Sequence, residues 1–360
     1  MFLPWKRQDV YRGAETSCRF QGYVKEWSYA HRGVAVLSFT NIASDEIRRQ
    51  ISEPPLTNEA IAYPHFNGTL DSFINNFIFL RFGYLMPMAK RKRPQLIHED
   101  YGGLSLFSRH SECHRKGCTQ DPYAFHWSPD GKLLRNNREL DCTISDKPCV
   151  SFKRALLRKG LATQKEVASL SLLLLKRYPQ IARALAYRFP VIIVDEAQDT
   201  SREQMEILET LFSAGGQTLI LVGDPDQAIY EWRDAEPEYF ISKMNDPSWE
   251  TTYLSSNFRS SQRICNATSL FSHVLSDKKP AFAQGETAAY GRKPILLQVN
   301  ADASHEDILQ RFQQYCIECE IEYSHEKVAV LTRRRIHAGT DIKDLWKGVE
   351  IQFLARATYE

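Results

Sequence analysis

The sequence predicts an α/β fold built on a parallel β-sheet. Three short apolar runs, residues 34–39, 191–194 and 218–222, are rich in β-branched residues and have the length of buried strands. Between the last two runs the apolar residues recur at helical spacing, at Met205, Ile207, Leu208, Leu211 and Phe212. Buried strands that alternate with amphipathic helices are typical of a parallel sheet.

The chain has 360 residues, enough for two domains of the usual size of roughly 100–200 residues each. Hydrophobic residues make up 43% and charged residues 25%, which is ordinary for a soluble globular protein. The formal net charge is only +2, so a nucleic-acid site must be a local patch and not a general field.

Targeting patterns are missing from the sequence. No apolar run reaches the roughly 18 residues that a membrane span requires, and residues 1–12 lack the apolar core of a secretory signal. Eight cysteines at irregular spacing favour free thiols in a reducing compartment. We therefore expect a cytoplasmic protein without a membrane partner.

Two adjacent carboxylates, Asp195 and Glu196, follow the 191–194 run directly. Open α/β sheets bind ligands at the carboxyl ends of their strands. Mg²⁺ prefers one or two carboxylates with phosphate oxygens, and a second carboxylate can orient or deprotonate an attacking water. Taken alone, the pair is also compatible with the acidic first turn of a helix. That alternative does not explain the wider pattern, DEAQD followed by GDPDQAIYEWR.

These two segments closely resemble motifs II and III of superfamily 1 DNA helicases of the UvrD/Rep/PcrA type. The resemblance implies a RecA-like P-loop NTPase motor domain that uses ATP and Mg²⁺, with Asp195 and Glu196 as metal-binding and catalytic residues. Gln227 would hydrogen-bond the terminal phosphate or the attacking water. Tyr230 and Trp232 would lie along a DNA strand and stack on its bases, and their alternative role is that of core aromatics.

The stretches VLSFTNIASDEI and GTLDSF resemble motifs Ia and Ib of the same family. By this resemblance Phe39 stacks on a base, with Thr40 and Asn41 beside it. The hydroxyls of Thr69 and Ser72 would hold DNA phosphates. The alternatives are a core role for Phe39 at a strand end and ordinary helix capping for Thr69 or Ser72.

The stretch LSSNFRSSQ resembles motif IV, and VAVLTR resembles motif IVa. Arg259 would engage the terminal phosphate across the cleft between two motor domains, since arginine is permanently charged and bidentate. Without this context an arginine before a helix is usually a solvated charge. The resemblance thus places Mg-ATP between Asp195, Glu196, Gln227 and Arg259.

The resemblance also sets a domain prediction. Residues 1–83 and 166–253 form the two parts of motor domain 1A. Residues 84–165 form a mainly helical inserted subdomain, and residues 254–360 form part of a second RecA-like domain, 2A, with a helix predicted over 308–317.

The chain departs from the family pattern in its phosphate loop. Where a Walker A loop, G-x-x-x-x-G-K-[ST], should cradle the phosphates, the chain reads RGAETSCRFQGYVKEW. Motifs V and VI of the family are also absent. We therefore expect the chain as written to be a weak or inactive ATPase that keeps the architecture. A truncated, frame-shifted or wrongly started gene and a paralogue that no longer hydrolyses ATP both fit this pattern.

The predicted insert carries further polar patterns. The basic run Lys90–Pro94 is either a contact to the DNA backbone or a solvated loop. A hairpin turn is predicted at 129–134 and a helical stretch at 153–189. Six residues can be considered as zinc ligands, although their spacing is not a standard zinc pattern: His110, Cys113, His114, Cys118, Cys142 and Cys149.

The function implied by the resemblance is ATP-driven translocation on single-stranded or partly duplex DNA, with 3′→5′ unwinding. Two other functions stay open. A non-catalytic DNA-binding or partner-binding module would use Phe39, Trp232 and the 90–93 run without turnover. A helicase-like subunit of an anti-phage defence system would also show stretches such as WRDAEPEYF and SNFRSSQ.

Overall fold

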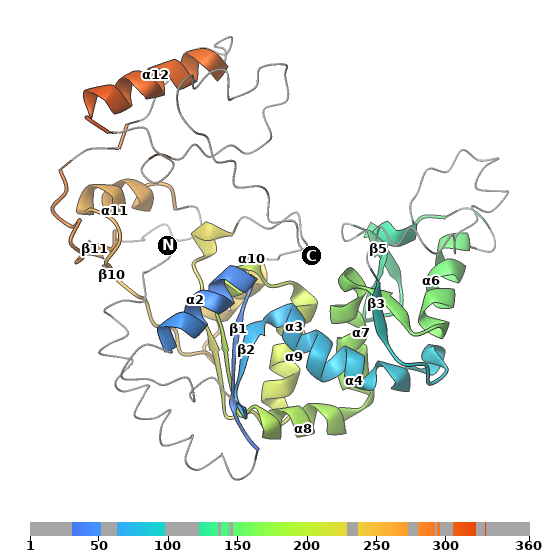
Figure 1. Cartoon of the computed structure of the whole chain (residues 1–360). Coiled ribbons are helices and arrows are strands. Elements are labelled where there is room, and N and C mark those ends of the chain that lie inside the picture. Colours follow the sequence, from blue (N-terminus) through green and yellow to red (C-terminus); the bar gives the residue numbers. More distant parts are fainter. Residues whose placement is uncertain are drawn as a thin grey trace. The chain divides into compact units, whose positions relative to one another are not determined.

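The computed structural model describes residues 31–51, 63–97, 122–135, 138–142, 144, 147–228, 237–272, 280–291, 294–295, 305–321 and 328. The chain divides into two compact units, Met1–Arg292 and Lys293–Glu360. The first unit contains the sheet and the candidate site (Figure 1). In the second, the helix α12 (His305–Glu318) is described, and it confirms the helix predicted over 308–317.

A four-stranded sheet forms the centre of the first unit. Its strands are β1 (Val34–Ser38), β2 (Phe66–Thr69), β8 (Val191–Val194) and β9 (Thr218–Leu221). The order is β2-β1-β8-β9, and every neighbouring pair is parallel. The sequence prediction of a parallel α/β sheet is therefore confirmed.

Amphipathic helices cover this sheet (Figure 1). They are α2 (Asn41–Ile51), α3 (Leu70–Ile74), α4 (Leu80–Phe82), α7 (Gln164–Arg177), α8 (Pro179–Arg188), α9 (Arg202–Ser213) and α10 (Pro237–Met244). A π-helical turn, η3 (Asn75–Phe79), connects α3 to α4. Phe189 packs edge to face against Phe73 and Phe77, and Phe73 and Phe77 are tilted against each other, with ring centres 4.9–5.3 Å apart.

The local sequence of helix α9 determines where the helix begins and which of its residues are buried. Ser201 accepts a hydrogen bond from the backbone of Gln204, and the Gln204 side chain accepts one from the backbone of Ser201, which fixes the helix start. The predicted apolar residues Met205, Ile207, Leu208 and Leu211 are buried. Phe212 shares the helical spacing but is 44% exposed.

The described part of residues 84–165 mixes strands with helix. β3 (Gln95–Ile97) pairs in parallel with β7 (Leu161–Thr163), while β4 (His126–Trp127), β5 (Leu133–Arg135) and β6 (Arg138–Glu139) form an antiparallel sheet beside α6 (Pro148–Arg158). The β4–β5 hairpin confirms the predicted turn. The described part of the insert therefore contains short strands as well as a helix, which the expectation of a mainly helical insert did not include. Strand β7 interrupts the helical stretch predicted at 153–189.

After α10 the chain forms β10 (Ser256–Asn257), α11 (Gln262–Ser269) and β11 (Phe282–Ala283). None of the helices within the described ranges is long and apolar enough to cross a bilayer. Five cysteines in these ranges, Cys142, Cys149, Cys265, Cys316 and Cys319, carry free thiols.

Candidate functional site

The site is organised by the carboxyl edge of the central sheet. Because the strands are parallel, the segments that follow them emerge at the same edge. Four sequence motifs therefore come together: Phe39–Asn41 after β1, Thr69–Ser72 at the end of β2, Asp195 and Glu196 after β8, and the turn η8 (Pro225–Gln227) after β9.

Asp195 is fixed between two strands. Its backbone N–H donates to the carbonyl oxygen of Leu37 at 2.8 Å, so it continues the β1–β8 ladder. The pKa of Asp195 is raised from 3.8 to about 6. Burial is the largest cause, the negative charge of Glu196 adds to it, and a hydrogen bond from the backbone of Glu196 offsets part of the rise. A carboxylate crowded by burial and by a like charge is a favourable ligand for a cation.

Glu196 has an unusual backbone. Its φ of 54° lies in the left-handed region, which a non-glycine residue rarely adopts. This turn redirects the chain from β8 into the short helix η7 (Ala197–Asp199) and directs the two carboxylates differently. Such conformations cost about 1–3 kcal/mol and cluster at functional sites.

Gln198 joins the two loops that carry the predicted catalytic residues. Its side chain is 1% exposed. The Nε2 group donates to Oε2 of Glu196 at 2.7 Å, and Oε1 accepts from the backbone N–H of Asp224 at 3.1 Å. Gly223 allows this approach, since a Cβ atom there would lie 2.5 Å from Oε1 of Gln198. The sequence analysis assigned no role to Gln198, although its place in DEAQD was the available signal.

Asp224 organises the turn that carries Gln227. Its two carboxylate oxygens accept hydrogen bonds from the backbone N–H of Asp226 at 3.2 Å and from Nε2 of Gln227 at 3.0 Å. The amide of Gln227 is thus oriented by a carboxylate that the sequence analysis did not single out. Gln227 keeps its side-chain oxygen and one N–H for a ligand.

The carboxylates fit a magnesium ion bound together with a nucleotide. Within the described ranges neither Asp195 nor Glu196 forms an ion pair with a cationic side chain, and no group of three or more histidine, cysteine or acidic residues is present. Mg²⁺ needs only one or two protein carboxylates when phosphate oxygens and water complete its shell.

Arg259 lies in the turn between β10 and α11. Asn257 builds this turn, since its side-chain oxygen accepts from the backbone N–H of Arg259 at 2.9 Å and of Ser260 at 2.8 Å. The Arg259 side chain is exposed. The segment also touches the candidate site, because Ser272 donates from Oγ to Asp226 at 3.1 Å. The phosphate contact of Arg259 stays a prediction.

The predicted DNA-binding residues divide by burial. Phe39 is half-buried at the end of β1 and Asn41 is exposed. Thr40 and Thr69 accept from the backbone of Ala43 and Ser72 at 3.2 and 3.1 Å, so they cap α2 and α3. This capping does not exclude a DNA contact, which stays a prediction for all of these residues.

Several predicted sites lie outside the described residues. They are Tyr230 and Trp232, the Walker A region before residue 31, the stretch VAVLTR apart from residue 328, and the candidate zinc ligands His110, Cys113, His114 and Cys118.

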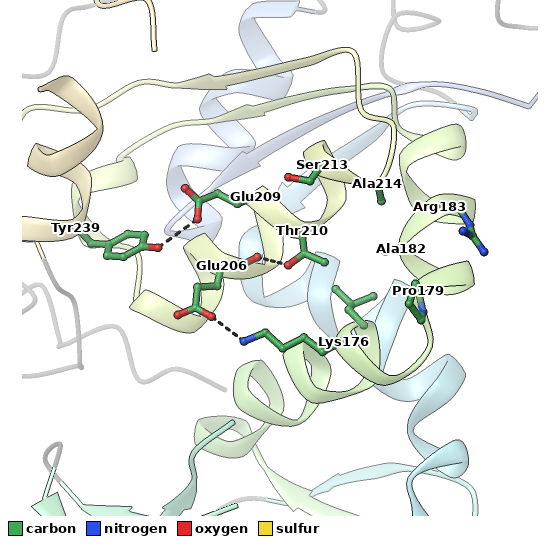
Figure 2. Close-up of a pocket in the computed structure, with 11 residues that line it drawn as sticks. Lys176, Pro179, Ala182, Arg183, Glu206, Glu209, Thr210, Ser213, Ala214 and Tyr239 are labelled. Atoms are coloured by element: carbon green, nitrogen blue, oxygen red, sulfur yellow. Dashed lines mark hydrogen bonds and ion pairs between the residues drawn. The ribbon is translucent and has the colours of Figure 1, made fainter. Parts of the chain in front are cut away.

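A groove of about 710 Å³ lies away from these motifs, between α8, α9 and α10 (Figure 2). Glu206 pairs there with Lys176 at 3.1 Å, and Glu209 accepts from the hydroxyl of Tyr239 at 3.2 Å and pairs with Lys243. None of the predicted catalytic residues lines it. Because its acidic groups are neutralised within the groove, the carboxyl edge remains the better candidate site.

Comparison with known proteins agrees with this geometry. Residues 132–248 match the N-terminal domain of UvrD/REP helicases. The RecBCD enzyme subunit RecB of Chlamydia muridarum is 30% identical over 289 residues, which cover 79% of this chain and 26% of that protein. The ATP-dependent DNA helicase PcrA of Staphylococcus aureus is 32% identical over 130 residues, covering 36% of this chain and 18% of that protein.

Over these matched regions the chain is similar to superfamily 1 DNA helicases of the UvrD/REP type. It spans about a quarter of the length of the RecB relative and less than a fifth of PcrA. The chain contains a single Gly-Lys pair, Gly131–Lys132, which is followed by Leu133 and lies in the β4–β5 hairpin. That pair is not a Walker A loop, which requires Ser or Thr after the lysine.

Proposed function

We propose that this chain forms motor domain 1A, its insert and part of domain 2A of an ATP-dependent translocase on single-stranded DNA, with 3′→5′ polarity and a cytoplasmic location. The observation that carries the proposal is the convergence of four helicase motifs on one sheet edge. The predicted domain boundaries, at residues 83, 165 and 253, belong to the same proposal.

The proposed roles follow from chemistry and position. Asp195 binds Mg²⁺, and Glu196 orients and deprotonates the attacking water. Gln227, held by Asp224, contacts the terminal phosphate. Bound Mg-ATP would supply the phosphoryl group whose transfer to water drives movement. Arg259 would neutralise charge on that phosphate from the β10–α11 turn.

The DNA strand would cross the same edge of the sheet. Phe39 offers a half-buried ring to a base. The capping hydroxyl of Thr69 and the hydroxyl of Ser72, to which Thr69 donates at 2.8 Å, would contact phosphates from the end of the neighbouring strand β2. Tyr230 and Trp232 would extend the stacking surface. The exposed run Lys90–Arg93 adds a backbone contact; Lys90 and Arg91 both have positive φ, at 44° and 57°, so this turn is tightly wound.

One observation favours a second candidate, a DNA-binding module without turnover: the chain contains no G-K-[ST] triplet. A decisive experiment measures Mg²⁺-dependent ATP hydrolysis by the purified chain, with and without oligothymidylate. DNA-stimulated hydrolysis that Glu196→Gln abolishes and the matched change Glu203→Gln leaves intact would support a working motor and would overturn the expectation of a weak or inactive ATPase.

Calorimetry with a non-hydrolysable ATP analogue separates binding from turnover. Binding that Arg259→Ala weakens would support the assigned cleft. DNA binding that is indifferent to nucleotide, without hydrolysis, would overturn the motor for this chain in favour of the binding module.

A further inference from the structure

The amino edge of the sheet, opposite the candidate site, brings three chain segments into contact. Residues 31–33 lead into β1, residues 63–65 into β2 and residues 187–190 into β8. The backbone N–H of Gly33 donates to the carbonyl oxygen of Arg188 at 2.9 Å, and a Cβ atom on Gly33 would lie 2.2 Å from the carbonyl oxygen of Pro64. The side chains of these segments are therefore held close together by the sheet.

These segments carry two arginines, one histidine and two tyrosines whose side chains lie close together. We call them the amino-edge cluster: His31, Arg32, Tyr63, Tyr187 and Arg188. The guanidinium of Arg32 lies 4.9 Å from the ring centre of Tyr187 and donates from Nε to the Tyr187 carbonyl oxygen at 3.0 Å. The guanidinium of Arg188 lies 5.2 Å from the ring centre of Tyr63. The Tyr63 hydroxyl and Nδ1 of His31 are 2.9 Å apart.

One side-chain donor atom of Arg188 has no hydrogen-bond partner. This atom, Nη1, is buried, and no carboxylate of the described residues pairs with the charge of Arg188. Besides Tyr63 its neighbour is the ring of Phe189, at 4.4 Å. Arg188 as a whole is half-buried, and without a carboxylate partner among the described residues its accessible donors can bind an anion from solvent.

The aromatic members of the cluster are open to solvent. Tyr63 is 70% exposed and Tyr187 is 58% exposed, although both are large apolar rings. Each ring has a guanidinium on one face, and Tyr63 also lies beside the ring of His31, with ring centres 5.9 Å apart. The remaining exposed surface of the two rings is open to a ligand. Guanidinium groups beside exposed aromatic rings match a ligand with phosphates and flat bases, and an acidic peptide would leave the rings uncovered.

We propose that the amino-edge cluster is a second binding site for single-stranded nucleic acid, in which bases stack on Tyr63 and Tyr187 and phosphates pair with Arg188 and Arg32. The site lies at the opposite edge from Asp195 and needs neither ATP nor Mg²⁺. It goes beyond the translocase function and would give the chain a second contact with a strand.

The test is photo-crosslinking of the whole chain to oligothymidylate that contains 5-iododeoxyuridine, with mapping of the crosslinked peptides, and titration of the same oligonucleotide by fluorescence anisotropy. We expect crosslinks in the peptides that carry Tyr63 and Tyr187. Tyr63→Leu and Tyr187→Leu should each remove the local crosslink and weaken that phase of binding about fivefold or more. Arg188→Lys, which keeps the charge but loses the planar fork, should weaken it less than Arg188→Gln.

The matched control is Tyr290→Leu, because Tyr290 is 54% exposed and lies outside the cluster. Both tyrosines of the cluster are at the surface, so their variants should fold, which a thermal melt verifies. Phe39→Leu should leave the amino-edge crosslinks unchanged. Loss of DNA binding at the carboxyl edge can therefore be distinguished from loss of binding at the amino-edge cluster. Three outcomes would each overturn the proposal. They are the absence of crosslinks at both tyrosines, equal binding of the oligonucleotide by Tyr187→Leu and Tyr290→Leu, and equal displacement of the bound oligonucleotide by polyglutamate and by oligothymidylate.

Discussion

The side-chain oxygen of Gln198 accepts a hydrogen bond from the backbone N–H of Asp224 at 3.1 Å. The other end of the same amide donates to Glu196 at 2.7 Å. The loops after β8 and β9 therefore share one buried side chain, and neither loop can shift alone without breaking a hydrogen bond. In the proposed translocase this link would join the residue that activates water to the turn that senses the phosphate.

Gln198→Ala should show how much this link contributes to the stability of the fold. The substitution leaves the Asp224 N–H and one oxygen of Glu196 without their partner, and an unsatisfied buried group costs about 1–3 kcal/mol. We expect the free energy of unfolding in urea to fall by about that amount, and hydrogen exchange at the Asp224 amide to accelerate. The control is Gln217→Ala, at an exposed glutamine, which should change stability by less than about 0.5 kcal/mol. Equal stability of the two variants would contradict the link.

Gly223→Ala tests the same contact by steric means. A Cβ atom at this position would lie 2.5 Å from Oε1 of Gln198 and 3.1 Å from Cζ of Phe240. We expect a loss of about 1–3 kcal/mol from overpacking. In the Gln198→Ala background the nearest of these atoms is removed while Phe240 remains, so the two losses should fall short of additivity by at least about 0.5 kcal/mol. Gly291→Ala, with no atom within 4 Å of its Cβ, is the neutral control. Additive losses would mean that the clash lies elsewhere.

The central sheet was predictable because its strands and helices carry strong local patterns. Val191–Val194 is apolar throughout, and α9 repeats its apolar residues at helical spacing. The strand β7 was missed, since its three residues, Leu-Ala-Thr, have no pattern of their own. Its extended form comes from pairing with β3, which is distant in sequence, and Gly160 supplies the positive φ of 79° that ends α6 before it.

The candidate site was predictable where one motif carries the chemistry. Asp195 and Glu196 were singled out because a carboxylate pair follows a strand within the resemblance to motif II, and Gln227 because of the resemblance to motif III; their roles stay predictions. Gln198 and Asp224 were not singled out, because their roles consist of hydrogen bonds between loops that follow different strands. Only the parallel pairing of β8 with β9 brings these loops together.

The raised pKa of Asp195 predicts how stability depends on pH. The folded state holds this proton up to about pH 6, whereas an ordinary aspartate releases it near 3.8. Ionisation therefore costs folding free energy, and stability should fall as the pH rises from about 4 to about 6, by on the order of 2–3 kcal/mol. Asp195→Asn should abolish this fall in denaturation measured at successive pH values. Mg²⁺ should stabilise the unsubstituted chain at pH 7 and leave the variant unchanged.

The control for this prediction has the opposite sign. Hydrogen bonds from the side chain and the backbone of Ser248 lower the pKa of Asp246, so its contribution is lost as the pH falls through that lowered pKa. Asp246→Asn should therefore leave the fall between pH 4 and 6 in place. A fall of the same size in Asp195→Asn would show that another group causes it.

The buried pair Lys153–Glu166 should stabilise the junction between α6 and α7 far more than an exposed pair of the same type. Its Nζ and Oε1 atoms are 3.1 Å apart with side chains 0% and 1% exposed, while Oε2 of Glu166 accepts from the backbone N–H of Thr163 at 2.9 Å. Lys153→Met strands a buried carboxylate, so we expect unfolding in urea to require about 3–5 kcal/mol less. Adding Glu166→Gln should recover part of that loss. Lys132→Met breaks the exposed pair with Glu139 and should change little. Equal effects at the two sites would mean that the buried pair stabilises the fold no more than the exposed one.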